Sequence, residues 1–151
     1  MLAAAPELHS RSMYKLERHK AEVRDEVNRL GLCPLMNDTR WRRLQAAIDS
    51  LPFPPPYQRK DVLRAEPDSP DLDADVSYQG NYTDECLGPF FATEWIRIRP
   101  RYLKQVGRLL PPVLVDCEAE LLQALRAYGL RHERDGDTIV IHGYKPTASA
   151  G

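Results

Sequence analysis

The stretch LRHERDGDTIVIH, residues 130–142, carries the strongest local signal for the fold. Asp135-Gly136 suits a type I′ turn, and residues 130–134 and 138–142 on either side are expected to form the two strands of a hairpin. The β-branched residues of the second strand favour a pleated, half-buried surface. This hairpin indicates an antiparallel sheet near the C-terminal end of the chain.

Three further segments are predicted to be strands. Residues 90–98 are the clearest of them, because successive side chains alternate between an apolar and a mixed face until Pro100 ends the segment. Residues 57–63 and the residues around 75–79 are expected to form the other two, joined by an acidic turn region at 66–73.

Glu94 stands out on the apolar face that it shares with Ile96 and Ile98. A carboxylate in such surroundings needs a partner, because burial of an unpaired charge is costly. Arg59 or Lys60 on a neighbouring strand is the natural candidate. We therefore expect a structural role for Glu94.

The N-terminal helix is expected to begin at Ser10 or Ser12, either of which can cap it, and to end at Gly31. Its apolar residues lie on one narrow stripe, and its other faces carry opposite charges three or four residues apart. Such a stripe packs either on the domain or on a second copy of the chain, so a homodimer through this helix is one expectation. The stripe includes Leu16, Val23, Val27 and Leu30.

Two more helices are predicted within the domain. Asn37, Asp38 or Thr39 can cap the first of them. Asp116 is expected to cap the second, and Gly129 is expected to end it. The proline-rich run 51–57 must be extended, because consecutive prolines exclude helix. The expected inward positions are Trp41, Leu44, Ile48 and Leu51 in the first helix and Leu121, Leu122 and Leu125 in the second.

These elements together predict an α+β fold with a mostly antiparallel sheet of about five strands, helices packed on one face, and an N-terminal amphipathic helix. Residues 1–35 are expected to be a helical extension and residues 36–145 a single α+β domain. Residues 146–151 are expected to be a disordered tail.

The composition excludes several classes of function. A formal net charge of -1 provides no positive field of the kind found in nucleic-acid-binding proteins. No apolar run has the length of a transmembrane helix or the form of a signal peptide. Cys33, Cys86 and Cys117 are too widely spaced for a zinc site or a disulfide framework. We expect a cytoplasmic protein without membrane attachment, metal or cofactor.

Residues 61–94 form an acidic block, with nine carboxylates and one arginine and so a net charge of -8. The alternating acids at 71–75 resemble the start of a calcium loop, but Val76 stands where that loop requires glycine. We therefore predict a protein–protein interaction module, of the immunity or inhibitor type, whose acidic surface binds a basic partner. The predicted partner-binding residues are Asp68, Asp71, Asp73, Asp75, Asp84 and Glu85.

Trp95, Arg97 and Arg99 alternate onto one strand face, a pattern found where an aromatic ring beside guanidinium groups holds single-stranded nucleic acid. The stripe has one aromatic residue and the chain is negative overall. We therefore expect a helix or loop to cover this face and do not expect nucleic-acid binding.

The alternative function is a small enzyme or ligand-binding domain with a pocket near Cys86, His132 and His142. The two histidines lie nearly symmetrically about the Asp135-Gly136 turn. A Cys–His pair requires closeness in space that a sequence does not show. No phosphate-binding loop, nucleophile elbow or metalloprotease motif is present, and we assign no catalytic residue.

Five short motifs lie along the chain: Asn37-Asp-Thr-Arg-Trp41, Arg59-Lys-Asp-Val62, a strand centred on Tyr78, Thr93-Glu-Trp-Ile-Arg-Ile98, and Ile141-His-Gly-Tyr144. Together they resemble a family of short, uncharacterised bacterial proteins, a domain of unknown function. The resemblance covers about residues 37–146, so residues 1–35 look like an addition to it. The family implies no established activity and no residue roles.

Overall fold

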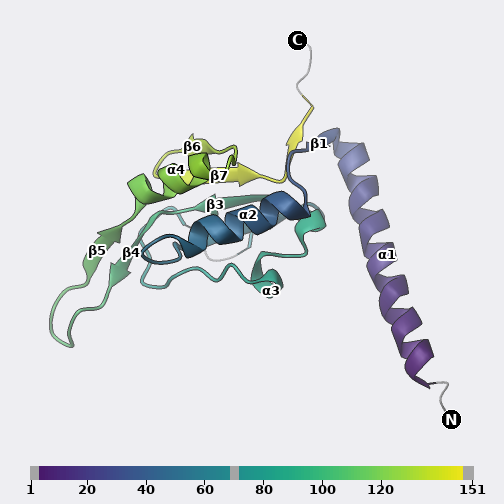
Figure 1. The fold of residues 1–151 in the computed structure, drawn as a ribbon, viewed down its shortest axis with the longest axis horizontal. Coiled ribbons are helices and arrows are strands. Elements are labelled where there is room, and N and C mark those ends of the chain that lie inside the picture. The colour runs from purple at the N-terminus through teal and green to yellow at the C-terminus, as the bar shows by residue number, and fades with distance from the viewer. Residues whose placement is uncertain (1–3, 69–71, 148–151) are drawn as a thin grey trace.

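The computed structural model describes residues 4–68 and 72–147 (Figure 1). In chain order, the elements are α1 (Ala4–Leu30), β1 (Leu32–Pro34), α2 (Asp38–Asp49), β2 (Tyr57–Asp61), α3 (Asp84–Leu87), the 3-10 helix η1 (Phe90–Ala92), β3 (Thr93–Ile98), β4 (Arg101–Lys104), β5 (Val113–Asp116), α4 (Glu118–Ala127), β6 (Glu133–Asp135), β7 (Thr138–His142) and β8 (Tyr144–Pro146).

The centre of the fold is a four-stranded antiparallel sheet in the order β2-β3-β7-β6. Ile96 of the central strand β3 lies opposite Arg59 of β2 on one side and Ile141 of β7 on the other. Two further antiparallel pairs, β1–β8 and β4–β5, lie outside this sheet. The expected α+β class and N-terminal helix are confirmed. The described residues form eight strands in three sheets, in place of the expected single sheet of about five strands.

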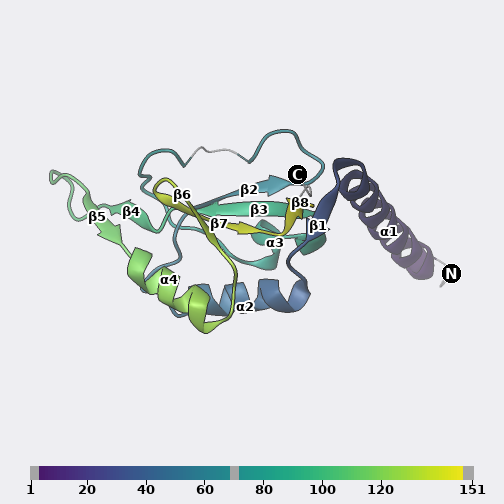
Figure 2. The ribbon, with the colours of Figure 1, turned by 90° about the horizontal axis from the view of Figure 1, so that it is seen from above.

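Helices α2 and α4 lie side by side on one face of the sheet, and residues 62–68 and 72–77 lie on the opposite side (Figure 2). The Trp41 ring of α2 stacks on Phe90 with the ring centroids 5.9 Å apart. Leu51 and Leu122 are only partly buried. The main core consists of Trp41, Leu44, Ala47, Ile48, Tyr82, Leu87, Ile96, Ile98, Leu121, Ala124, Leu125, Leu130, Ile139 and Ile141.

Helix ends follow the local signals in the sequence. Asn37 caps α2, because its side-chain oxygen accepts a hydrogen bond from the Arg40 N–H at 2.8 Å. At α4 the N-cap position is Cys117, but the Asp116 carboxylate still accepts a hydrogen bond from the Glu118 N–H at 2.8 Å. Glycines with positive φ follow α1 and α4, namely Gly31 at 66° and Gly129 at 67°.

Two local predictions are wrong. The residues around 75–79 form no strand, because the carboxylates beside them are held by arginine side chains that impose an irregular path. The hairpin turn is not type I′, since Asp135 pairs with Thr138 and leaves Gly136 and Asp137 as the turn residues. Gly136 has φ 59° and Asp137 has a negative φ, which fits a type II′ turn.

The β4–β5 hairpin has no counterpart among the strands expected from the sequence. Pro100 was expected to end the strand before it, and it lies just outside the β4–β5 ladder, as do Pro111 and Pro112. At the base of the hairpin, Tyr102 packs against Phe53, with ring centroids 4.6 Å apart, and against Cys117. The rest of the hairpin extends away from the sheet (Figures 1 and 2).

Helix α1 starts at Ala4, well before the expected caps Ser10 and Ser12. Near its C-terminal end, Val23 and Val27 pack into a small cluster with residues of the domain. Its N-terminal half projects away from the body (Figures 1 and 2), where Met13 and Leu16 are about half exposed. Half of the apolar stripe is therefore used by the chain's own domain.

Both ends of the chain reach the domain through the β1–β8 pair. Cys33 of β1 lies opposite Lys145 of β8. The Thr147 N–H donates to the Gly31 carbonyl at 2.8 Å. The expected extension therefore contributes β1 to the body, and the expected tail contributes Pro146 and Thr147; residues 148–151 lie outside the described residues.

Candidate functional site

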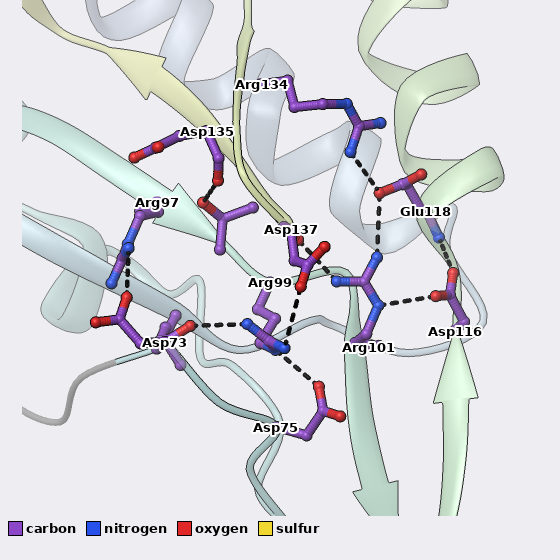
Figure 3. Close-up of polar contacts among 12 residues, drawn as sticks. Asp73, Asp75, Arg97, Arg99, Arg101, Asp116, Glu118, Arg134, Asp135 and Asp137 are labelled. Atoms are coloured by element: carbon purple, nitrogen blue, oxygen red, sulfur yellow. Dashed lines mark hydrogen bonds and ion pairs between the residues drawn. The ribbon is translucent and has the colours of Figure 1, made fainter.

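The predicted acidic surface and the predicted nucleic-acid stripe lie against each other (Figure 3). Arg97 of β3 pairs with Asp73 at 3.0 Å, and Arg99 pairs with Asp75 at 2.7 Å. The Arg99 side chain is only 8% exposed, so this pair is largely shielded from solvent. Trp95 is half-buried beside this row. The two acids belong to the predicted partner-binding surface and the two arginines to the predicted nucleic-acid stripe. Their charges neutralise each other within the chain.

Arg101 continues this row on β4. Its guanidinium group donates to Asp116 at 2.9 Å and to Glu118 at 3.1 Å, and Arg134 of β6 reaches Glu118 at 3.0 Å. The hydrogen bonds from Arg134 and Arg101 lower the pKa of the Glu118 carboxyl. Partial burial of the Asp116 carboxyl acts to raise its pKa. Hydrogen bonds from the Glu118 N–H and from Arg101 outweigh this effect, so the pKa of Asp116 is lowered. The network ties the base of the β4–β5 hairpin to α4 and β6.

The other predicted partner-binding acids differ in their surroundings. Asp84 of α3 pairs with Arg42 of α2, and this hydrogen bond lowers the pKa of the Asp84 carboxyl. Asp68 and Glu85 are exposed, and their carboxylates have no partner among the described residues. Asp71 lies outside the described residues. Among the described residues of the predicted acidic surface, Asp68 and Glu85 therefore have carboxylates available to bind a partner protein.

Glu94 has the structural role expected for it. Its carboxylate accepts a hydrogen bond from Lys60 at 2.8 Å across the β2–β3 pair. Arg59 points elsewhere: its side chain is buried and donates to the Thr93 hydroxyl at 2.8 Å and to the Leu87 carbonyl at 3.1 Å. These contacts hold β2 and the segment after α3 onto β3.

A cavity of about 610 Å³ lies between β1, the start of α2, the loop after α4, and the β7–β8 segment. His132 and His142 both line it, and so does Cys33. Cys86 instead lines a separate pocket of about 200 Å³ beside Tyr57. The structure thus brings the two histidines of the alternative function to one cavity and places Cys86 elsewhere.

The histidines are held by neighbours in the cavity wall. His142 Nε2 lies 3.3 Å from a Glu133 oxygen, and Glu133 also accepts a hydrogen bond from Lys145, which lowers the pKa of the Glu133 carboxyl. His142 Nδ1 is buried and has no hydrogen-bond partner among the residues that the structure describes. His132 Nδ1 lies 3.1 Å from the Leu130 carbonyl oxygen. Both imidazole rings are therefore fixed in orientation.

The cavity also contains positive groups that sequence reasoning missed. Arg40 comes from the first turn of α2, Arg131 from the loop before β6, and Lys145 from β8. No local signal could have grouped them, because they are far apart along the chain. Among the described side chains, no three His, Cys, Asp or Glu residues come together as a metal site would require. The arrangement is suited to binding an anion.

No helix in the described part of the chain combines the length and the apolar composition needed to cross a membrane.

The fold and this cavity define an α+β domain built on a four-stranded antiparallel sheet and closed by the pairing of its two terminal strands. The chain belongs to a family of unknown function, DUF6678, whose model matches residues 23–148. The match begins within α1, upstream of residue 37 where the expected resemblance starts, and it includes both β1 and β8. A search of curated proteins and a search of solved structures each found no match.

Proposed function

We propose that this protein is an interaction module that binds a partner protein through the end of its β4–β5 hairpin. The observation that carries the proposal is a concentration of exposed apolar side chains there, which we call the hairpin tip. Leu109 is 97% exposed, and the others are between 47% and 59% exposed. The hairpin tip consists of Val106, Leu109, Leu110, Val113 and Leu114.

Exposed apolar side chains are common on protein surfaces when they are scattered, but a concentration of them on one projecting element is typical of a binding site. Removing apolar surface from water stabilises a complex by about 25 cal/mol per Å². The base of the hairpin is held by Tyr102 packing and by the Arg101 network, so the tip is presented on a fixed support. Little ordering is then required on binding.

The charge around the hairpin tip indicates the chemistry of the partner. Lys104 and Arg108 flank the apolar residues, and residues 95–114 contain no acidic residue. A partner surface complementary to the hairpin tip and its basic neighbours is an apolar groove with acidic residues at its rim. The acidic segment supports a basic partner less well, because Asp73, Asp75 and Asp84 already pair with arginines of the same chain.

The test combines site-specific photocrosslinking with paired variants. A photoreactive residue at position 109 is expected to give a discrete crosslink to another protein in host-cell extract. The double variant Leu109→Glu/Leu110→Glu should lower affinity for that purified partner by roughly a hundredfold, because buried apolar anchors carry most of the binding free energy. Circular dichroism and the thermal midpoint should not change, because both side chains lie in solvent.

Leu63→Glu is the matched control, since Leu63 is an exposed leucine, at 39%, outside the hairpin. It should leave the affinity unchanged. A crosslink from position 109 to a second copy of the chain would replace the proposal with self-association. Sedimentation with phosphatidylglycerol vesicles that is lost in the double variant would replace it with membrane binding. Equal affinity of the double variant and the Leu63→Glu control would also contradict it.

A further inference from the structure

We propose that the cavity beside β1 and β8 binds a small organic anion, with a carboxylate or phosphate head group and an apolar body. This site is separate from the hairpin tip. Its wall contains His132 and His142, the two histidines that the sequence analysis placed near a pocket. Their proposed role is in ligand binding. The proposal stands on the size of the cavity, the charge of its wall and the way the wall is held.

The volume is that of a small-molecule site. The cavity measures about 610 Å³, and ligand pockets usually measure roughly 300–1,000 Å³. Leu35, Met36 and Leu130 supply apolar wall. A ring or short hydrocarbon chain can therefore be buried there, and polar groups at the wall can select its head group.

The wall is formed before any ligand arrives. The β1–β8 pair makes one side, with Cys33 opposite Lys145. The Leu35 N–H donates to the Gly143 carbonyl at 2.8 Å, which fixes the chain between β1 and α2. Binding in such a site requires little ordering of the protein.

The charge of the wall favours an anion. Among the described residues that line the cavity, Glu133 is the one with a carboxylate, and its charge is neutralised by Lys145 in the same wall. Neither Arg40 nor Arg131 forms an ion pair with a carboxylate of the described residues. Arg40 donates to the Leu35 carbonyl at 2.7 Å through one of its nitrogens. Guanidinium groups without a carboxylate partner are well matched to carboxylate or phosphate oxygens.

His142 provides an independent sign of a functional site. Its Nε2 lies 3.3 Å from a Glu133 oxygen, and its Nδ1 is buried without a hydrogen-bond partner in the described part of the chain. Buried polar atoms are almost always hydrogen-bonded in proteins, and the exceptions are concentrated at strained or functional sites. A small shift of the ring or of its surroundings on binding could give Nδ1 a partner.

The first experiment is a titration followed by two-dimensional ¹H–¹⁵N NMR, with benzoate and phenyl phosphate as the anionic probes. Benzamide is the neutral counterpart of benzoate, and phenol that of phenyl phosphate. We expect saturable shifts at Gly129, Arg131 and His132 with the anions and at least tenfold weaker binding of the neutral probes, because a charged hydrogen bond contributes about 1.5–3 kcal/mol. Comparison of the two anions identifies the preferred head group.

Arg131→Gln is the variant that tests the site, because Arg131 is exposed and its side chain forms no hydrogen bond or ion pair with the other described residues. It should weaken the anion about tenfold, and Arg131→Lys should restore part of the affinity because it restores the charge. Arg43→Gln removes one positive charge from an exposed position of α2 outside the cavity and should have no effect.

Three results would overturn the proposal: no saturable shift with either anion at millimolar concentration, equal binding of benzoate and benzamide, or equal affinity of Arg131→Gln and the unmodified protein. Because Leu109→Glu/Leu110→Glu leaves the cavity intact, that variant should bind the probes normally. Failure of the anion site and failure of the hairpin proposal are therefore distinguishable.

Discussion

Replacing Asp75 by alanine is expected to lower the free energy of unfolding by about 3 kcal/mol, because it leaves the buried Arg99 guanidinium without its closest counter-charge. The Arg99 side chain is 8% exposed, and its Nε lies 2.7 Å from Asp75. What remains is a hydrogen bond to the Leu72 carbonyl at 3.0 Å and the exposed Asp137 at 3.9 Å. Neither compensates a desolvated cation as well as the lost carboxylate does.

Urea unfolding monitored by tryptophan fluorescence measures this change. Asp68→Ala is the control, because Asp68 is an exposed acid of the same segment without a side-chain partner among the described residues. It should shift the free energy of unfolding by less than about 0.5 kcal/mol. In a double-mutant cycle, Arg99→Met combined with Asp75→Ala should recover part of the loss, since the unpaired charge is gone. Equal effects of Asp75→Ala and Asp68→Ala would contradict the prediction.

This result also bears on how the acidic segment is tested for partner binding. Neutralising Asp73 and Asp75 removes the counter-charges of Arg97 and Arg99 and so perturbs the fold. A loss of partner binding in such a variant would not show whether the acids contact the partner or only stabilise the fold. Asp68→Asn combined with Glu85→Gln is the appropriate probe, because both carboxylates are exposed and free of contacts in the described part of the chain.

Gly143→Ala is expected to have an effect of similar size, about 3 kcal/mol, through overpacking. A Cβ at this position would lie 2.1 Å from the Thr93 carbonyl oxygen and 3.1 Å from the Trp41 ring. Neither neighbour can yield easily: Thr93 belongs to the central strand, and Trp41 is in the core. The Gly143 N–H donates to Glu94 O at 2.7 Å, which holds the backbone in place.

The thermal midpoint of Gly143→Ala should fall by roughly 10 °C, since about 1 kcal/mol corresponds to 2–4 °C for a chain of this size. Gly107→Ala is the matched control. Its Cβ would meet only the flexible Leu110 side chain, at 3.2 Å. A midpoint for Gly143→Ala within a degree or two of the control would show that the close approach of these strands is not required.

Much of the local structure could be predicted from the sequence because its signals lie within a few adjacent residues. The cap at Asn37, the glycine stops at Gly31 and Gly129, and the 3–4 spacing in α2 and α4 each depend on neighbours along the chain. The closing hairpin was predicted for the same reason, although its turn type was not. The partner of Glu94 was also foreseen, because a carboxylate on an apolar strand face requires one.

Predictions failed where the outcome depended on distant residues. The strand expected at 75–79 had the alternation but no ladder partner. Arginines 24 positions further along the chain hold Asp73 and Asp75. The β4–β5 hairpin was missed because the prolines around it resemble breaks in the chain, although its ladder avoids them.

The sequence by itself determined the α+β class, most helix ends and the closing hairpin, because backbone conformation responds to capping, spacing and turn residues nearby. Only the tertiary structure decided that the acidic and basic stripes cancel each other, that the apolar residues of the hairpin tip face solvent, and that two histidines meet Arg40 and Arg131 at one cavity. The physical reason is that charge pairing and burial depend on which surfaces meet in space, and a linear pattern does not specify those meetings.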